Sequence, residues 1–134
     1  MTEEATPYKP LYLGEISRDA IEKVDIIPWE SGSISITLTC DEFTTRCPIT
    51  TQPDFGSLEI TYTPNKHIIE TKSLKLYLTG FRDMGVFSER LVCQLAQDLY
   101  EQVKPHYIRV TGDFNSRGGV AIHATTELPD LESV

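Results

Sequence analysis

One cysteine and one aspartate lie close together in the stretch Arg46-Cys47-Pro48-Ile49-Thr50-Thr51-Gln52-Pro53-Asp54. A thiol can attack an electrophilic carbon, and a carboxyl group beside it can donate or accept the proton that such a reaction moves. Proline fixes its own φ and favours extended backbone in the residue before it, so Pro48 and Pro53 restrict the relation between the two groups. The stretch therefore favours covalent catalysis, with Cys47 as nucleophile and Asp54 as its proton source.

Both residues also have simpler interpretations. A lone cysteine is usually a small buried hydrophobic residue. The surroundings of Cys47 favour a reactive role, whereas Cys40 and Cys93 fall within predicted strand and helix stripes and are interpreted as structural. Asp54 follows a proline in a string that is common in turns, and for this residue the sequence leaves both interpretations open.

Further charged residues could bind a ligand. Glu89 stands in the first turn of a predicted helix, where the helix dipole stabilises a carboxylate by about 0.3–1 kcal/mol. A carboxylate fixed there can also accept two hydrogen bonds from a guanine-like edge. Lys72 and Lys75 are three residues apart near another helix start, which suits a phosphate, although a solvated amphipathic face explains them equally well. Arg117 adds a cation on a predicted turn.

A metal site is a weaker alternative. It would combine Cys40 and Cys47 with one of three histidines, His67, His106 or His123. None of these residues shows the close spacing of structural zinc ligands, so we predict no metal. The chain also has no Walker A string and no G-x-G-x-x-G motif, which excludes the common nucleotide-binding frames.

Alternating and helical patterns predict the elements that position these groups. Residues 33–39 and 57–63 alternate apolar and polar side chains and predict two antiparallel strands, joined by a long loop that contains Cys47. Residues 71–81 predict a helix, although periodicity alone leaves helix and strand both possible for the first half of this segment. Residues 88–103 predict a second helix, which starts at Ser88 as N-cap and ends before a proline. Two more strands follow, at 107–114 and 119–126, with 115–118 as their turn.

The order β-β-α-α-β-β predicts an α+β architecture, with a four-stranded antiparallel sheet and two helices on one face. We expect an N-terminal arm at 1–30, one domain at 31–128 and a tail at 129–134. Such a sheet has open edges, and pairing of edges between copies would cover them, so a homo-oligomer is expected.

Composition excludes several classes of function. The net charge of −8 argues against a general nucleic-acid binder. No apolar run approaches the length of a membrane span, and the polar N-terminus does not resemble a secretory signal. Three irregularly spaced cysteines do not indicate a disulfide framework. We therefore expect a cytoplasmic protein that contacts neither membranes nor nucleic acid directly.

Five motifs occur in order along the chain: Cys47-Pro48, Asp54-Phe55, Glu70-Thr71-Lys72-Ser73-Leu74-Lys75-Leu76-Tyr77, Phe81-Arg82 and Glu89. From about residue 34 to residue 123, the chain resembles the single-module NADPH-dependent 7-cyano-7-deazaguanine reductases of queuosine biosynthesis. These enzymes belong to the tunnelling-fold superfamily. The lysine-rich octad is close to diagnostic for the family.

The resemblance implies a specific reaction. Cys47 would add to the nitrile carbon of 7-cyano-7-deazaguanine and form a covalent thioimide, while Asp54 would protonate the nitrile nitrogen. Two successive NADPH molecules would then reduce the adduct to the aminomethyl product. The tunnelling fold further implies assembly into rings, with sites between subunits.

The resemblance also assigns the binding residues. Glu89 would read the deazaguanine edge, and the remaining substrate-binding positions would be Ile69, Glu70, Thr71 and Ser88. The phosphates of NADPH would be held by Lys72, Lys75 and Arg117. Two positions depart from the family pattern, since Ser88 stands where the family has histidine and Thr71 where it has serine. A serine cannot titrate near neutral pH, so proton delivery or substrate placement can differ here.

Three other functions remain open. An amidinotransferase of the archaeosine type would capture the same nitrile on Cys47 but use ammonia, and Lys72 with Lys75 favours the reductase over it, whereas Ser88 weakens that preference. A non-catalytic tunnelling-fold protein would only bind a purine or pterin. A zinc-dependent cyclohydrolase is the weakest of the three.

Overall fold

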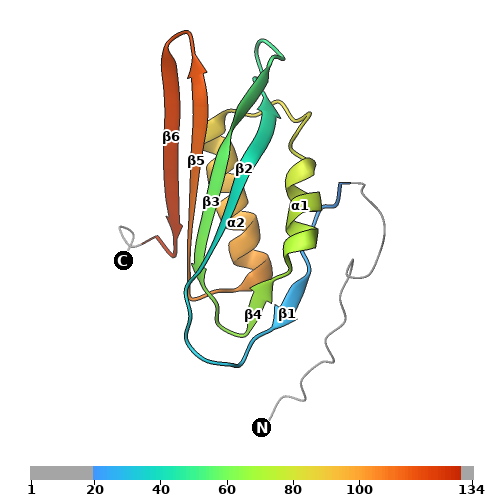
Figure 1. Ribbon diagram of the computed structural model, residues 1–134, viewed down its shortest axis with the longest axis vertical. Helices are drawn as coiled ribbons and strands as arrows, with labels where there is room; N and C mark the ends of the chain where they lie inside the picture. Colours follow the sequence, from blue (N-terminus) through green and yellow to red (C-terminus); the bar gives the residue numbers. More distant parts are fainter. Residues whose placement is uncertain (1–19, 131–134) are drawn as a thin grey trace.

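The computed structural model describes residues 20–130, which form two short strands, four long strands and two helices (Figure 1). In chain order they are β1 (Ile26–Pro28), β2 (Ile36–Arg46), β3 (Pro53–Thr63), β4 (His67–Ile69), α1 (Thr71–Thr79), α2 (Ser88–Val103), β5 (Tyr107–Arg117) and β6 (Val120–Leu128). No helix within 20–130 is long and apolar enough to cross a membrane.

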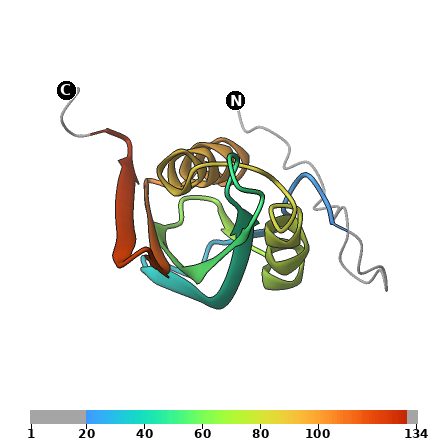
Figure 2. The same ribbon diagram turned by 90° about the horizontal axis from the view of Figure 1, so that it is seen from above.

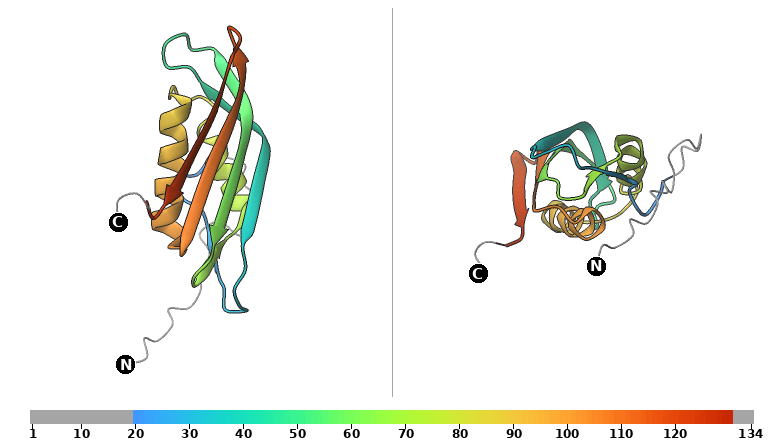
Figure 3. Two further views of the ribbon diagram at one scale, coloured as in Figure 1. Left: turned by 90° about the vertical axis from the view of Figure 1, so that its left-hand side faces the viewer. Right: turned by 90° about the horizontal axis from the view of Figure 1, so that it is seen from below.

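The four long strands form an antiparallel sheet in the order β2-β3-β5-β6. Both helices lie on the same, concave side of this sheet, with α1 beside β2 and α2 across β5 and β6 (Figures 2 and 3). The predicted α+β architecture and its β-β-α-α-β-β order are confirmed. The prediction lacked β1 and β4, which pair with each other as a separate two-stranded sheet.

The core lies between the sheet and the helices. Alternate residues of β3 and β5 point into it, and α2 contributes the apolar stripe that its sequence predicts. The large apolar side chains that are fully buried include Leu58, Ile60, Tyr62, Leu91, Leu95, Leu99, Ile108 and Val110. A Cβ atom on Gly112 would lie 2.8 Å from Val92 of α2, so the absence of a side chain lets this helix approach β5 closely.

The β2–β3 hairpin is longer than predicted. Its strands run to Arg46 and from Pro53, so the long loop expected around Cys47 shrinks to residues 47–52, and Asp54 lies in β3 opposite Thr45. The pairing is irregular between Cys40 and Phe43. This bulge interrupts the alternation of apolar and polar residues from which the strand was predicted. Beyond the bulge the strand continues, with Phe43 and Thr45 buried.

The β5–β6 hairpin turns later than predicted. Gly118 and Gly119 form its tip with φ values of +60° and +84°, a conformation that glycine adopts without steric cost. The expected turn at 115–118 is therefore wrong for residues 115–117, and Arg117 is the last residue of β5, paired with Val120. Figure 1 shows that this tip lies at the same end of the sheet as the β2–β3 tip.

The N-terminal segment is partly integrated into the fold. Residues 1–19 lie outside the described residues, as do 131–134. Val24 is a core residue and Asp25 is buried, so these two residues of the predicted N-terminal arm pack into the folded domain. The backbone of Asp25 is bonded to Ser73 and Glu70 at the start of α1, which the sequence pattern did not reveal.

Candidate active site

Cys47 lies in the turn between β2 and β3, and this turn is closed by two backbone hydrogen bonds. The Cys47 N–H donates to the Gln52 carbonyl at 2.9 Å, and the Thr51 N–H donates to the Cys47 carbonyl at 3.0 Å. The thiol is partly exposed at the end of the sheet. The turn therefore fixes the cysteine backbone while leaving its sulfur accessible.

A second set of bonds ties this turn to the segment that connects α1 and α2. The backbone of Arg46 is bonded to Met84 at 3.1 Å and to Val86 at 3.2 Å. Its guanidinium donates to Asp83 Oδ1 from Nη2 at 3.0 Å and to the Thr51 carbonyl from Nη1 at 3.0 Å. The connection leads directly into α2, so the Cys47 turn and the start of α2 are held in one unit.

The pKa of the Cys47 thiol is lowered from its ordinary value. The main cause is a hydrogen bond with the Thr50 hydroxyl, followed by bonds from the backbone N–H groups of Thr50 and Ile49. Slight desolvation and the nearby charge of Asp54 act in the opposite direction. The thiolate, which is the nucleophilic form, is therefore easier to form at Cys47 than at an ordinary cysteine.

The two other cysteines differ from Cys47. Burial raises the pKa of Cys40, whose Sγ donates to the Glu42 carbonyl at 3.6 Å. Cys93 is exposed on α2 and does not belong to the buried stripe of that helix, contrary to the prediction. Among the three thiols, Cys47 has the environment that a nucleophile requires.

Asp54 is held by Arg117, a contact between residues 63 positions apart. Arg117 Nη1 donates to Asp54 Oδ1 at 2.7 Å, and Nη2 donates to the side-chain oxygen of Gln52. The Asp54 side chain is only 17% exposed, whereas that of Arg117 is 40% exposed. The structure thus joins Arg117 to the Cys47–Asp54 group, a placement that only the register of β3 and β5 could have indicated.

Glu70 has a structural role that the sequence analysis missed. It is the N-cap of α1, where Oε1 accepts from the Lys72 N–H at 2.8 Å and Oε2 accepts from the Ser73 N–H at 2.7 Å. The residue is only 8% exposed. Ile69 beside it is buried, with its N–H bonded to the Tyr62 hydroxyl at 2.9 Å, and Thr71 is exposed.

The start of α2 differs slightly from the prediction. Phe87 occupies the N-cap position, with no side-chain cap, and its carbonyl accepts from the Leu91 N–H at 2.9 Å. Ser88 is the first residue of the helix and is buried, so its predicted role as N-cap is wrong. Glu89 is exposed in the first turn, as predicted.

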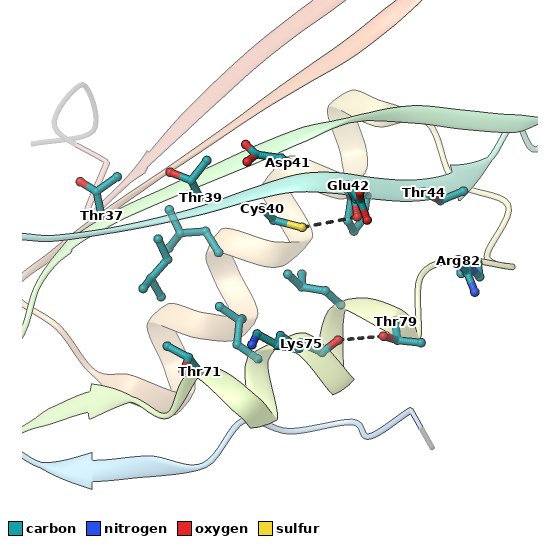
Figure 4. A pocket seen from close by; sticks show the side chains of 15 residues that line it. Thr37, Thr39, Cys40, Asp41, Glu42, Thr44, Thr71, Lys75, Thr79 and Arg82 are labelled. Carbon is teal, nitrogen blue, oxygen red and sulfur yellow. Dashed lines mark hydrogen bonds between the residues drawn. The ribbon is translucent and has the colours of Figure 1, made fainter. Parts of the chain in front are cut away.

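A cavity of about 690 Å³ lies between β2 and α1 (Figure 4). Lys75 and Arg82 line it together with Thr71, and β2 contributes Asp41 and Glu42. Among the predicted site residues, Thr71 and Lys75 lie on its wall, while the Cys47 turn and the start of α2 do not. Within one chain, the predicted site residues that line the cavity are therefore separate from those at the Cys47 turn and at the start of α2.

The combination of Cys40, Cys47 and a histidine is not brought together as a metal site. Within residues 20–130, no group of three or more histidine, cysteine, aspartate or glutamate side chains is arranged to hold a metal ion.

Comparison with known proteins finds a matching family and similar relatives. Residues 53–132 match the family described as "QueF-like protein". An "NADPH-dependent 7-cyano-7-deazaguanine reductase" from Frankia casuarinae is 42% identical over 114 residues, which cover 85% of this chain and 91% of that protein. A protein of the same name from Helicobacter pylori strain Shi470 is 52% identical over 87 residues, or 65% of this chain, and this match spans only 60% of that relative's length.

The fold has a counterpart among solved structures. The crystal structure of the archaeosine synthase QueF-Like in the apo form superposes with a TM-score of 0.63 at 19% identity, covering 74% of this chain and 95% of the other. This likeness confirms the predicted tunnelling fold. At that identity it shows the fold alone.

Proposed function

The chain belongs to the QueF-like protein family, and from this premise we propose that it reduces the nitrile of 7-cyano-7-deazaguanine to the aminomethyl group with NADPH, as a step of queuosine biosynthesis. The observation that carries the proposal is the β2–β3 turn. It presents a thiol of lowered pKa close enough to Asp54 for the carboxylate charge to act on it. A nucleophile with an adjacent proton carrier is what capture of a nitrile needs.

We propose that the first step adds the Cys47 thiol across the nitrile. The sulfur bonds to the nitrile carbon, one carbon–nitrogen π bond breaks, and its electron pair takes up a proton at nitrogen. The thiol loses one proton and the nitrogen gains one, so the thioimide forms without any external reagent. Asp54 is the group that transfers this proton.

When bound, NADPH would supply two hydrides in succession, and together with two protons these would convert the nitrile carbon to an aminomethyl carbon and release the Cys47 thiol. The cavity between β2 and α1 fits its phosphates, because Lys75 and Arg82 provide two cations and Thr71 a hydroxyl. Because the carboxylates of Asp41 and Glu42 on β2 repel an anion, Lys75 and Arg82 on the opposite wall would hold the phosphates. Lys72 lies on the same helix and adds positive charge there.

The substrate is proposed to bind at the start of α2 and at residues 69–71. Glu89 is exposed in the first turn of α2, and its carboxylate can accept two hydrogen bonds from the deazaguanine edge. Because both carboxylate oxygens of Glu70 cap α1, we propose that Ile69, Glu70 and Thr71 shape the pocket mainly through a rigid backbone. Ser88 is proposed to complete the pocket where the family has histidine.

A homo-oligomer would bring the cavity residues of one copy close to Cys47 and Asp54 of another. The cavity that contains Lys75 does not include Cys47 or Asp54, and β2 and β6 are edge strands of the four-stranded sheet. A second copy placed against β2 would bring its own groups toward this cavity. We therefore propose that the complete site lies between subunits.

The test combines intact mass with an NADPH assay. The wild-type protein mixed with the nitrile alone should gain the mass of one substrate at Cys47, and added NADPH should then be consumed at two molecules per nitrile. Cys47→Ala should lose both signals. The exposed Cys93→Ala should keep both, since this thiol is not part of the proposed site.

Two outcomes contradict the proposal. An adduct that forms and never consumes NADPH would indicate the amidinotransferase type of reaction, which needs ammonia instead. Tight binding of the nitrile with no adduct in the wild type would indicate a protein that only binds the base.

A further inference from the structure

Arg117 makes two contacts with the β2–β3 hairpin from the end of β5. Nη1 donates to Asp54 Oδ1 at 2.7 Å, and Nη2 donates to the side-chain oxygen of Gln52. The N–H groups of a guanidinium lie in one plane at fixed angles. The position of the Asp54 carboxylate and that of the Gln52 side chain are therefore coupled, because both accept hydrogen bonds from the same rigid group.

Gln52 connects this contact to the nucleophile. Its carbonyl accepts the hydrogen bond from the Cys47 N–H that closes the turn, at 2.9 Å. Arg117 is thus bonded directly to the carboxylate and through one residue to the backbone of the cysteine. A change at Arg117 can alter the relation between the thiol and Asp54 without touching either residue covalently.

The end of β5 is a suitable anchor for such a contact. Arg117 pairs with Val120 across the Gly118–Gly119 turn, and the strand pairing is irregular between Phe114 and Arg117. A bulge changes the direction in which the following side chains point. The β3–β5 pairing runs as far as Gly56 and Phe114, so the Arg117–Asp54 ion pair links the two strands beyond their backbone ladder.

We propose that Arg117 is a positioning residue for the addition step: it holds the carboxylate of Asp54 and the turn of Cys47 in the geometry for proton transfer to the nitrile nitrogen. This inference rests on the proposed function, since it concerns the same thiol and carboxylate. It differs from the role that the sequence resemblance implies for Arg117, which is to hold NADPH phosphate.

The two roles of Arg117 affect different steps. A positioning residue acts when the thioimide forms, and this step takes place without NADPH. A residue that holds cofactor phosphate acts only when NADPH binds, so its loss raises the KM for NADPH and leaves adduct formation unchanged. Measuring the addition step in the absence of cofactor therefore separates the two.

The experiment compares Arg117→Gln, Arg117→Lys and Arg109→Gln in the full chain. Arg109 is a matched control, since it lies on the same strand and contacts Glu59 at 3.8 Å on the sheet surface. The rate of adduct formation with 7-cyano-7-deazaguanine is followed by rapid quench and intact mass, without NADPH. Because misplacement of a catalytic group by about 1 Å can cost about 100-fold, we expect Arg117→Gln to react about 10- to 100-fold more slowly. Arg117→Lys should recover part of the rate, and Arg109→Gln should match the wild type.

A wild-type rate of adduct formation in Arg117→Gln, with a raised KM for NADPH, would overturn the positioning role and leave the proposed function intact. A wild type that forms no adduct would instead defeat the proposed function itself. Gln52→Leu provides a second variant should Arg117→Gln unfold, because it retains the ion pair and removes only the contact with the turn. Slower adduct formation in Gln52→Leu supports the proposal, and an unchanged rate contradicts it.

Discussion

Two carboxylates that the sequence places in one site are held in very different ways. Glu70, at the start of α1, is buried, and both its oxygens accept hydrogen bonds from backbone N–H groups two and three residues further on. Asp54, near the tip of the β2–β3 hairpin, is held through Oδ1 by the side chain of Arg117 on a different strand. The first arrangement stabilises a helix. The second leaves a carboxylate beside a thiol, where it can carry a proton.

This comparison predicts that the two carboxylates affect different measurements. Asp54→Asn should slow adduct formation by about 100- to 10,000-fold, the usual contribution of a general acid or base, because an amide cannot transfer the proton. Thermal unfolding should change little. The rate is measured by intact mass, with Asp113→Asn, an exposed aspartate of β5 that contacts His123, as the control. A near-normal rate of adduct formation in Asp54→Asn would show that Asp54 does not transfer the proton.

Glu70→Ala should act chiefly on stability. Loss of an N-cap side chain costs about 0.5–2 kcal/mol of unfolding free energy, and here it leaves the Lys72 and Ser73 N–H groups without their acceptor. The measurement is chemical denaturation with circular dichroism. Glu101→Ala, on the exposed face of α2, is the control and should be close to neutral. Equal stability of the two variants would mean that the cap is not what Glu70 contributes.

Two thiols, Cys40 within β2 and Cys47 in the turn that follows it, provide a pH-dependent version of the comparison. The pKa of Cys47 is lowered by Thr50 and that of Cys40 is raised by burial, so alkylation of Cys47 by iodoacetamide should begin at a lower pH than alkylation of Cys40. Since the Thr50 hydroxyl favours the thiolate, Thr50→Val should move the reaction of Cys47 to higher pH. Peptide mass mapping follows each thiol, with Thr125→Val as the control. A midpoint that stays in place would exclude the hydroxyl as the cause.

The smallest effect is expected at Asp83, which contacts Arg46 on the surface. Exposed salt bridges contribute about 0.2–1 kcal/mol, and these side chains are 43% and 78% exposed, so Asp83→Ala should lower the unfolding free energy by less than about 1 kcal/mol. Adduct formation should stay close to the wild-type rate, because backbone bonds of Arg46 to Met84 and Val86 still hold the turn. The small stability difference should disappear at high salt. A large loss of rate would show that the side-chain contact is needed.

Local patterns in the sequence accounted for most of the fold. The alternation in β3 and the stripe of α2 follow from the repeat of the backbone, so their faces are readable from neighbouring residues. The bulge between Cys40 and Phe43 breaks that repeat, and the prediction ended β2 too early for this reason. The short strands β1 and β4 were also missed, because three residues are too few to show an alternation of apolar and polar side chains. They pair with each other and not with the four-stranded sheet.

The sequence by itself determined the order of the four long strands and two helices and, through its motifs, the family, and it predicted the Cys47–Asp54 pair. These depend on residue types and short spacings, which the chain carries directly. Only the tertiary structure decided that Arg117 holds Asp54, that Glu70 caps α1 and that the cavity with Lys75 lies apart from Cys47. Such contacts depend on strand register and on how helices sit against the sheet, which bring together residues far apart in the chain.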